Sequence, residues 1–497
     1  LYKHNQVKSR ETMRGKDDLF HLIKAMSKSE KRYFTLDAKK SGKEAAKYLS
    51  LFQTVNNMEE YNEQKLKDKF KKSLSSDKGY LYEAILRSMR DYRSAKSRAS
   101  QVKERIMDSR YLYERGLYNQ FEERLQDAKE MVIELDDNFT LLEIIKEEQL
   151  AKQNLTLYSQ GYLKGLEQVN LEKSHTIEAV LEELKYLDLY FKLAIQLTKE
   201  FELKDELKKQ ELNKIIPKEI FCESYTPTSP HAKLRYIKCK AFYFQLIGED
   251  DEVFKNWKEV LDWWEAHPKI KEEDFFRYII DVSNFLNTCF KITKYKNLIP
   301  GFLSKLEKEK PRSNHDQGIL FHKLTLSKLL YCFSKNEFEE AKKLIPEIEN
   351  GLKKHNLPND LVIVGNVVFM LFMTNDYKDC HIWSQKIIQK KSDKREDIQR
   401  IVRILNVICL YEIGDIDQLD SAMRAVSRYF KYQKISSRAF EVKVYNFLKK
   451  IFNASISDRK SILIDFNNFL KAFRQETKNK QILGLDILLY WVGNTRP

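Results

Sequence analysis

The sequence predicts an all-α fold in which a right-handed α-solenoid of helical hairpins follows a basic N-terminal helical region. The chain is 42% hydrophobic and 32% charged, with only 14 Gly and 9 Pro, and this composition favours long amphipathic helices over many short strands. No proline precedes Pro217, so no obligatory helix breaker interrupts the first 216 residues. In addition, a polar turn recurs through the second half of the chain.

Differences in composition divide the 497 residues into expected segments. The clearest break is the run YTPTSP, because its two prolines and three hydroxyl residues do not continue a helix. The expected segments are a frayed N-terminus at 1–16, a basic N-terminal helical domain at 17–110, helical repeats with long helices at 111–224, a loop at 225–230, a regular hairpin array at 231–450 and capping helices at 451–497.

Local signals place helices in the basic domain. Ser27 and Glu30 have the spacing of a capping box, in which each side chain binds the backbone amide of the other residue. A helix is therefore expected to begin directly after Ser27 and to bury Tyr33, Phe34 and Leu36. Further helices are expected at 47–55, 63–74 and 80–109.

The charge of the chain is unevenly distributed. The formal net charge is +15, and residues 1–110 contribute +12 of it, from 27 Lys and Arg against 15 Asp and Glu. A basic region on a nearly neutral body suggests an acidic partner, such as nucleic acid, anionic lipid or an acidic protein. The alternative is that lysines only keep long helices soluble.

The recurring turn predicts the architecture of the second half. Phe338, Tyr377 and Ile416 hold equivalent positions 39 residues apart, each after an apolar helix and at the start of an amphipathic one. One hairpin cannot cover its own apolar face, so a period of two helices predicts stacked hairpins. Earlier copies, which extend the period to about 45, are expected at Tyr118, Asp250 and Tyr295.

This turn resembles that of the tetratricopeptide (TPR) family, which places Gly or Asn, Asp and an aromatic residue before a small residue. Here it stands as Asn336-Glu337-Phe338 with Ala341, Asn375-Asp376-Tyr377 with Cys380, and Gly414-Asp415-Ile416 with Leu419. The first helix departs from the family, because Leu329 stands where a small residue is usual, and the closing proline is absent. The resemblance covers about 111–450 and implies a concave surface, lined by first helices, that binds a peptide, a protein segment or RNA.

Basic and aromatic residues on the expected first helices form a candidate partner-binding groove, able to hold an acidic peptide or a C-terminal carboxylate through charge-assisted hydrogen bonds. The alternative is ordinary salt bridging between helices. In Trp263-Trp264, one residue is expected in the core and one at the rim. The candidate groove residues are Arg235, Lys238, Arg277, Lys323, Phe333, Arg400, Arg403 and Arg438.

A second candidate site lies in the basic domain, where arginines recur every third residue along the helix expected at 80–109. Such a ridge could contact phosphates through bidentate arginines, and the alternative is a solvated face that pairs with nearby carboxylates. The candidate phosphate-contact ridge is Arg87, Arg90, Arg93, Lys96 and Arg98.

No recognisable catalytic signature is present. The sequence lacks the glycine-rich nucleotide loops, HExxH and GxSxG, so no cofactor, metal or catalytic residue is assigned. His322 is expected to pack or to face the groove, and a hidden site in the N-terminal region is left as a third alternative. None of the six cysteines forms a CxxC pair, which suggests reduced thiols in a cytoplasmic protein.

The sequence therefore favours a non-enzymatic helical-repeat scaffold that binds a protein or peptide partner, such as an acidic one, through its concave face. The alternative is a nucleic-acid-binding solenoid that uses the basic N-terminal helix for phosphate contacts. No run approaches eighteen apolar residues, so no membrane span is expected. Self-association is left open.

Overall fold

The structure is a computed structural model whose regular secondary structure is helical throughout the described residues, which confirms the all-α prediction. The chain separates into two compact units, Leu1–Tyr278 and Ile279–Pro497. The described residues are 17–40, 43–70, 73–94, 97–153, 160–199, 203, 205–222, 224–311, 313–355, 357, 360–389, 395–437, 439–476 and 482–494.

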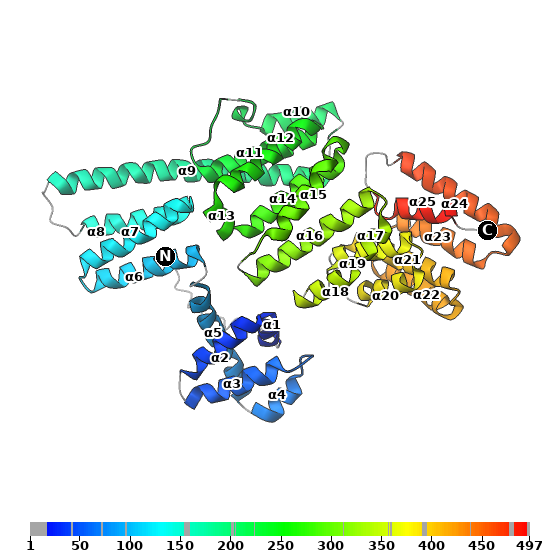
Figure 1. The fold of residues 1–497 in the computed structure, drawn as a ribbon, viewed down its shortest axis with the longest axis horizontal. Helices are drawn as coiled ribbons and strands as arrows, with labels where there is room; N and C mark the ends of the chain where they lie inside the picture. The colour runs from blue at the N-terminus through cyan, green and yellow to red at the C-terminus, as the bar shows by residue number, and fades with distance from the viewer. Residues whose placement is uncertain are drawn as a thin grey trace, which may run out of the picture. The chain divides into compact units, whose positions relative to one another are not determined.

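The first unit contains α1 to α13 (Figure 1), with a 3₁₀ turn at Lys218–Phe221 before α11. The helices are α1 Asp18–Ala25, α2 Lys28–Lys39, α3 Lys43–Asn56, α4 Glu63–Phe70, α5 Leu74–Ser94, α6 Arg98–Glu114, α7 Tyr118–Glu134, α8 Asn138–Gln153, α9 Gln160–Lys199, α10 Glu206–Ile215, α11 Pro230–Ile247, α12 Asp250–Ala266 and α13 Pro268–Glu273.

The boundary between the units falls inside α14, Phe275–Lys291, and the second unit continues to α25. A 3₁₀ turn at Thr293–Leu298 follows α14. The remaining helices are α15 Ile299–Lys308, α16 Asn314–Ser334, α17 Phe338–Lys342, α18 Ile345–Lys354, α19 Leu361–Met373, α20 Tyr377–Ile388, α21 Glu396–Ile413, α22 Ile416–Tyr432, α23 Phe440–Asn453, α24 Ile456–Glu476 and α25 Leu485–Asn494.

Helices α1–α5 share a hydrophobic core that includes Ile23, Phe34 and Leu81. The capping box at the start of α2 is confirmed, because Ser27 Oγ accepts the Glu30 amide at 3.2 Å and Glu30 Oε2 accepts the Ser27 amide at 2.7 Å. Phe34 is buried, but Leu36 is 54% exposed. The expectation that Leu36 is buried was wrong, because two residues turn a helix by about 200° and place it on the opposite face from Phe34.

The single helix expected at 80–109 is in fact two helices. Helix α5 ends at Ser94 and α6 begins at Arg98, with Ser97 extended as its N-cap. The carboxylate of Glu273, at the end of α13, accepts the backbone amides of Arg98 at 3.0 Å and Ala99 at 3.2 Å. Because the free amides at a helix N-terminus favour a carboxylate, a residue 175 positions away stabilises this start. The domain boundary expected at 110 falls inside α6, which packs on α7.

The recurring turn has one backbone geometry. Each first helix is followed by a residue with positive φ: +58° at Asn336, +59° at Asn375 and +80° at Gly414. The next amide then bonds a carbonyl five residues back, as Asp376 N does to Leu371 O at 2.9 Å and Asp415 N does to Leu410 O at 3.1 Å. This is the Schellman arrangement, which caps the carbonyls at a helix end.

The second helix of each pair begins two residues after the left-handed residue. Phe338, Tyr377 and Ile416 are therefore the first residues of α17, α20 and α22, as the spacing predicted. Tyr118 and Asp250 likewise open α7 and α12. The copy expected at Tyr295 differs. Residue 295 lies in the 3₁₀ turn, and the following helix starts at Ile299, next to a proline that suits a first helical turn.

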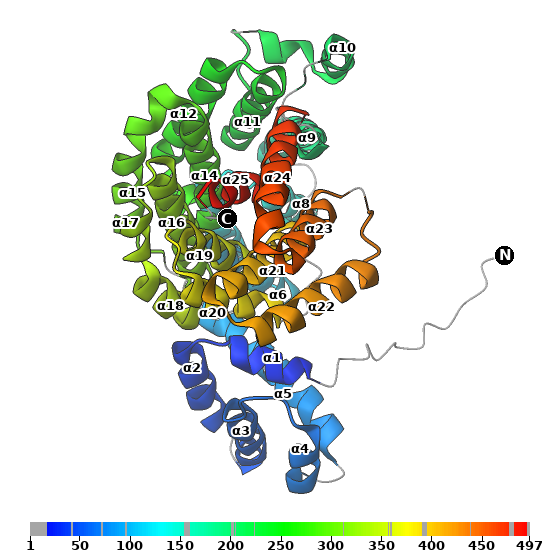
Figure 2. The same cartoon turned by 90° about the vertical axis from the view of Figure 1, so that its right-hand side faces the viewer.

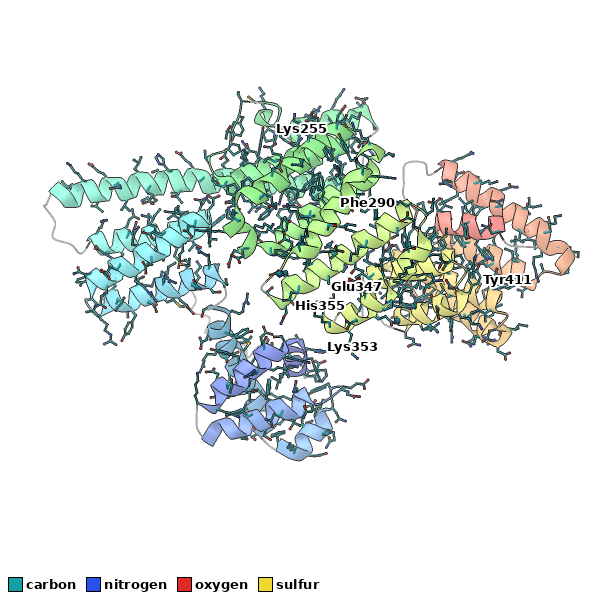
Figure 3. The ribbon with its side chains drawn as sticks, viewed as in Figure 1. Lys255, Phe290, Glu347, Lys353, His355 and Tyr411 are labelled. Atoms are coloured by element: carbon teal, nitrogen blue, oxygen red, sulfur yellow. The ribbon has the colours of Figure 1, made fainter. Side chains whose placement is uncertain are left out.

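Aromatic pairs across the turn hold several hairpins closed. The ring of Phe338 lies 5.5 Å from that of Phe333, and the ring of Tyr377 lies 5.6 Å from that of Phe372. In both cases, the partner precedes the aromatic residue by five positions. The equivalent of these partners in the last copy is Tyr411 (Figure 3), which stacks instead on Phe452 of α23 at 4.4 Å.

The first helices of the second unit also pack on one another in sequence. Contacts join α16 to α19, α19 to α21 and α21 to α23, and Figures 1 and 2 show α19, α20 and α21 side by side. Leu329, Val368 and Val407 are fully buried in their shared core. The contact between α19 and α21 is close, because a Cβ at Gly365 would lie 2.8 Å from Ile398 Cγ2.

Two glycines test the importance of the left-handed turn. An added Cβ would meet no other atom within 4 Å at either Gly414, which has φ +80°, or Gly301, which lies inside α15. We expect Gly414→Ala to lower the free energy of unfolding by about 1–2 kcal/mol through backbone strain, and Gly301→Ala to raise it by about 0.5–1 kcal/mol. Thermal unfolding followed by circular dichroism measures both. If both variants shifted the unfolding temperature in the same direction, the left-handed conformation of Gly414 would not be the constraint proposed here.

Candidate binding site

The candidate groove residues of the first unit bind neighbouring groups. Arg235 donates to Glu183 Oε1 from Nη2 at 2.6 Å, and both side chains are largely buried. Lys238 is buried, with Nζ 5.8 Å from the ring centre of Trp264. Arg277 is more exposed and pairs with Asp274 at 2.8 Å.

In the second unit, several candidates also join helices. Arg400 pairs with Glu396 at 2.6 Å and lies 4.0 Å from Glu441 of α23. Phe333 contacts Phe338 across a hairpin turn. Burial lowers the pKa of Lys323, and the nearby carboxylate of Asp360 partly offsets this effect. Residue 438, the last candidate of the groove, lies outside the described residues.

Arg403 differs from the candidate arginines Arg235, Arg277 and Arg400 because no described carboxylate lies within ion-pair distance of it. Its guanidinium donates to Gln399 O at 3.0 Å and to Ile388 O at 3.4 Å, and it lies 4.0 Å from the ring centre of Tyr429. Burial lowers the pKa of Arg403, with the Tyr429 hydroxyl acting in the opposite direction. A half-buried cation without an anion is less favourable than a paired one, so a negatively charged group would be stabilised at this position.

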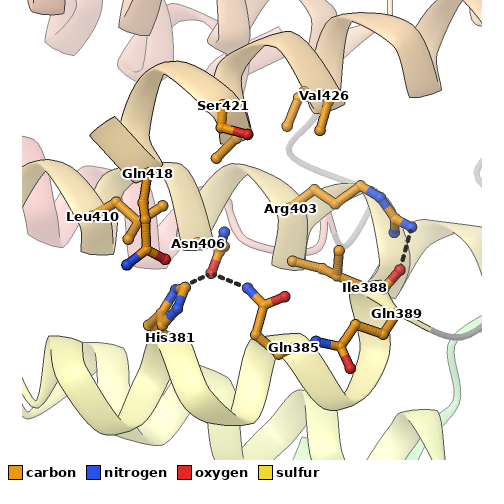
Figure 4. A pocket seen from close by; sticks show the side chains of 12 residues that line it. His381, Gln385, Ile388, Gln389, Arg403, Asn406, Leu410, Gln418, Ser421 and Val426 are labelled. Atoms are coloured by element: carbon orange, nitrogen blue, oxygen red, sulfur yellow. Dashed lines mark hydrogen bonds between the residues drawn. The ribbon is translucent and has the colours of Figure 1, made fainter. Parts of the chain in front are cut away.

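Arg403 borders a cavity of about 420 Å³ between α20, α21 and α22 (Figure 4). The residues of α22 that face it include Ser421, Ala422 and Ala425, whose small side chains leave the space open. The full lining is His381, Gln385, Ile388, Gln389, Arg403, Asn406, Leu410, Gln418, Ser421, Ala422, Ala425 and Val426.

A hydrogen-bonded group forms the polar floor of this cavity. Oδ1 of the buried Asn406 lies 2.8 Å from His381 Nδ1 and accepts a bond from Gln385 Nε2 at 3.3 Å. In this arrangement the His381 proton is on Nδ1, because the amide oxygen of Asn406 can only accept. Figure 4 shows both contacts, and in this view His381 lies to the left of Gln385 and Arg403 to its upper right. The cavity therefore offers a cation and several polar groups, and none of its lining side chains is a carboxylate.

Of the residues that line this cavity, only Arg403 was a candidate from the sequence. His381, Gln385 and Asn406 come from two helices and form no spaced motif. The sequence feature that could have indicated this cavity is the group of small residues on α22. Ser421, Ala422 and Ala425 have side chains too short to fill the space between α22 and its neighbours.

The candidate ridge is divided by the break between α5 and α6. Arg87, Arg90 and Arg93 are exposed on α5, and no described carboxylate pairs with them. Residue 96 lies outside the described residues. Arg98 is on α6 and pairs with Glu134, which Lys269 also binds at 2.7 Å. The single-helix ridge is therefore limited to three arginines of α5.

Trp263 and Trp264 are both buried, at 5% and 0% exposure, so the expectation of one rim residue was wrong. Both can be buried because each meets a different helix: the ring of Trp263 lies 5.8 Å from that of His231 of α11, and the ring of Trp264 lies 6.0 Å from that of Tyr278 of α14. His322 packs as expected, with Nε2 2.8 Å from Asp360 Oδ2.

Most of the cysteines pack as small apolar residues, whereas Cys222 is exposed. Cys239, Cys289 and Cys409 are buried, and Cys332 is half-buried. Burial raises the pKa of Cys289 to about 12, so its thiol is protonated at neutral pH. Across the described residues, no group of three or more His, Cys, Asp or Glu is arranged to hold a metal ion. In the same part of the chain, none of the helices is sufficiently long and apolar to span a membrane.

No known protein family, curated protein or solved structure matches this chain. Its function is therefore inferred from the geometry of its own residues.

The half-buried Arg235 and Arg403 should respond differently to loss of their charge. Arg235→Met leaves Glu183 buried without its partner, so we expect it to lower the free energy of unfolding by about 3–5 kcal/mol. Arg403→Met removes a cation that no carboxylate neutralises, so we expect a change within about 1 kcal/mol. Thermal unfolding distinguishes them. A large loss in Arg403→Met would show that Arg403 is mainly structural.

Proposed function

We propose that this protein is a non-enzymatic, TPR-like right-handed α-solenoid that binds a protein partner and receives an acidic group of it beside Arg403. The repeated Schellman turn and the sequential packing of the first helices support the solenoid. The observation that carries the binding proposal is the half-buried guanidinium of Arg403, which borders an open cavity without a carboxylate. We also propose a cytoplasmic location, supported by the buried, protonated thiols.

The proposed contact does not lie on the concave surface of first helices that the sequence predicted as the binding groove. One first helix, α21, supplies Arg403 and Asn406, and the second helices α20 and α22 supply most of the rest of the cavity. The space suits a single aspartate or glutamate side chain, or a C-terminal carboxylate, of an extended partner segment. Charge-assisted hydrogen bonds from Arg403 would give that group its affinity.

Capture of partners from native lysate tests this function. We expect Arg403→Gln to weaken capture of its specific partners by about 10- to 100-fold, the effect of losing a hydrogen bond to a charged group worth about 1.5–3 kcal/mol. Arg424→Gln is the matched control, because Arg424 lies on α22, is exposed and pairs with Asp420. Nuclease treatment excludes indirect capture. Equal recovery by both variants would reject the role of Arg403.

Nucleic-acid binding is the second candidate function, favoured by one observation. Arg87, Arg90 and Arg93 form an exposed row on α5 without described carboxylate partners. Nearby, the ring of Tyr92 lies 5.0 Å from that of Tyr33. Such a row can contact successive phosphates without reading sequence.

Salt-dependent binding to single-stranded RNA and to duplex DNA tests this alternative. If α5 contacts phosphates, reversal of Arg87, Arg90 and Arg93 to Glu should reduce the slope of log K against log salt by about two to three. The control reverses three exposed lysines of α23 and α24, which gives the same net charge: Lys449, Lys460 and Lys471. If the slope fell equally in both variants, binding would depend only on the net charge of the protein, and the arginines of α5 would have no special role.

A further inference from the structure

Helix α9 has two apolar faces, of which only one is covered. Its inner face packs on α11, where the rings of Tyr186 and Tyr236 lie 5.4 Å apart and Glu183 binds Arg235. The outer face is exposed over the same length of helix. Its large apolar residues are Ile177 at 40%, Leu181 at 61%, Leu184 at 42%, Phe191 at 56% and Ile195 at 58% exposure.

The spacing of this exposed stripe indicates that a second helix can pack against it. Its positions are 177, 181, 184, 188, 191 and 195, so the steps alternate between four residues and three. This is the heptad pattern of a coiled-coil seam, whose side chains fit between those of a second helix. Contiguous apolar patches on a soluble surface commonly mark interaction sites. Only position 188, an aspartate, interrupts the stripe.

We propose that the outer face of α9 pairs with α9 of a second copy of this chain, with the two helices antiparallel. A two-fold axis near Tyr186 places Ile177 opposite Ile195 of the other copy and Leu181 opposite Phe191. Every exposed apolar position then meets an apolar position, except that Leu184 meets Asp188. A closed, two-fold contact of this kind uses the same surface on both copies.

The charges beside the stripe support the antiparallel direction. Heptad geometry places Glu178 of one helix beside Lys192 of the other, twice in each dimer. The two copies of Lys185 face each other at the centre, and each lies next to an Asp188 of the seam. Within one chain, Lys192 pairs with Asp188 at 2.6 Å, with both side chains more than half exposed. A parallel pair would place two copies of Asp188 against each other in the seam, which like charges disfavour.

Sedimentation of the full chain over a range of concentrations tests the proposal. We expect a reversible dimer that Leu181→Lys with Phe191→Lys weakens at least about tenfold, because charges replace the buried seam. The control is Leu207→Lys on α10, at a leucine that is 69% exposed. Circular dichroism checks that each variant folds, as expected for exposed positions. A wild-type chain that stays monomeric, or a dimer that is equally strong in the variant and the control, would overturn the proposal.

A charge exchange tests the direction of pairing. Glu178→Lys places two lysines together across the antiparallel interface, and Lys192→Glu places two glutamates together, so each single variant should weaken the dimer. The double variant restores both pairs and should recover the wild-type association. In a parallel pair these residues do not meet, so absence of recovery in the double variant would overturn the antiparallel arrangement.

Discussion

The left-handed residue after each first helix is the constraint on which the second unit depends. At Asn336, Asn375 and Gly414, the chain reverses within two residues while the preceding carbonyls remain hydrogen-bonded. The next helix must therefore lie against the helix that it follows. Once each hairpin is closed, the apolar side of its first helix is still uncovered, and the packing of α16, α19, α21 and α23 in sequence buries it.

Electrostatic pairing decides which basic residues remain available to a partner. Arg235 and Arg400 bind carboxylates from their own or neighbouring helices, so their charges mainly serve packing. Arg403 has carbonyl and aromatic neighbours, and no described acidic group neutralises its charge. A basic residue in a sequence is weak evidence for a binding site. It becomes stronger evidence when the fold partly buries its charge and places no carboxylate beside it.

Elements encoded by neighbouring residues were predictable, and those that depend on distant residues were not. The capping box at Ser27 and the helix starts at Phe338, Tyr377 and Ile416 follow from local spacing. The break before α6 depends in part on Glu273, which is distant in sequence. The burial of both Trp263 and Trp264 likewise depends on two flanking helices. Of the candidate cavity, the sequence indicated Arg403 but not the polar floor, because that floor joins α20 and α21.

The sequence by itself determined that the chain is helical, where its hairpins turn and where basic residues concentrate, since these properties depend on composition and short spacing. The tertiary structure decided which faces and charges are covered. Helix α9 shows the difference: its apolar residues lie on two sides, and its contacts with other helices, chiefly α11, distinguish the buried side from the exposed heptad stripe. Burial is a property of neighbours brought together by folding, and helical periodicity alone does not specify which neighbour an apolar face will meet.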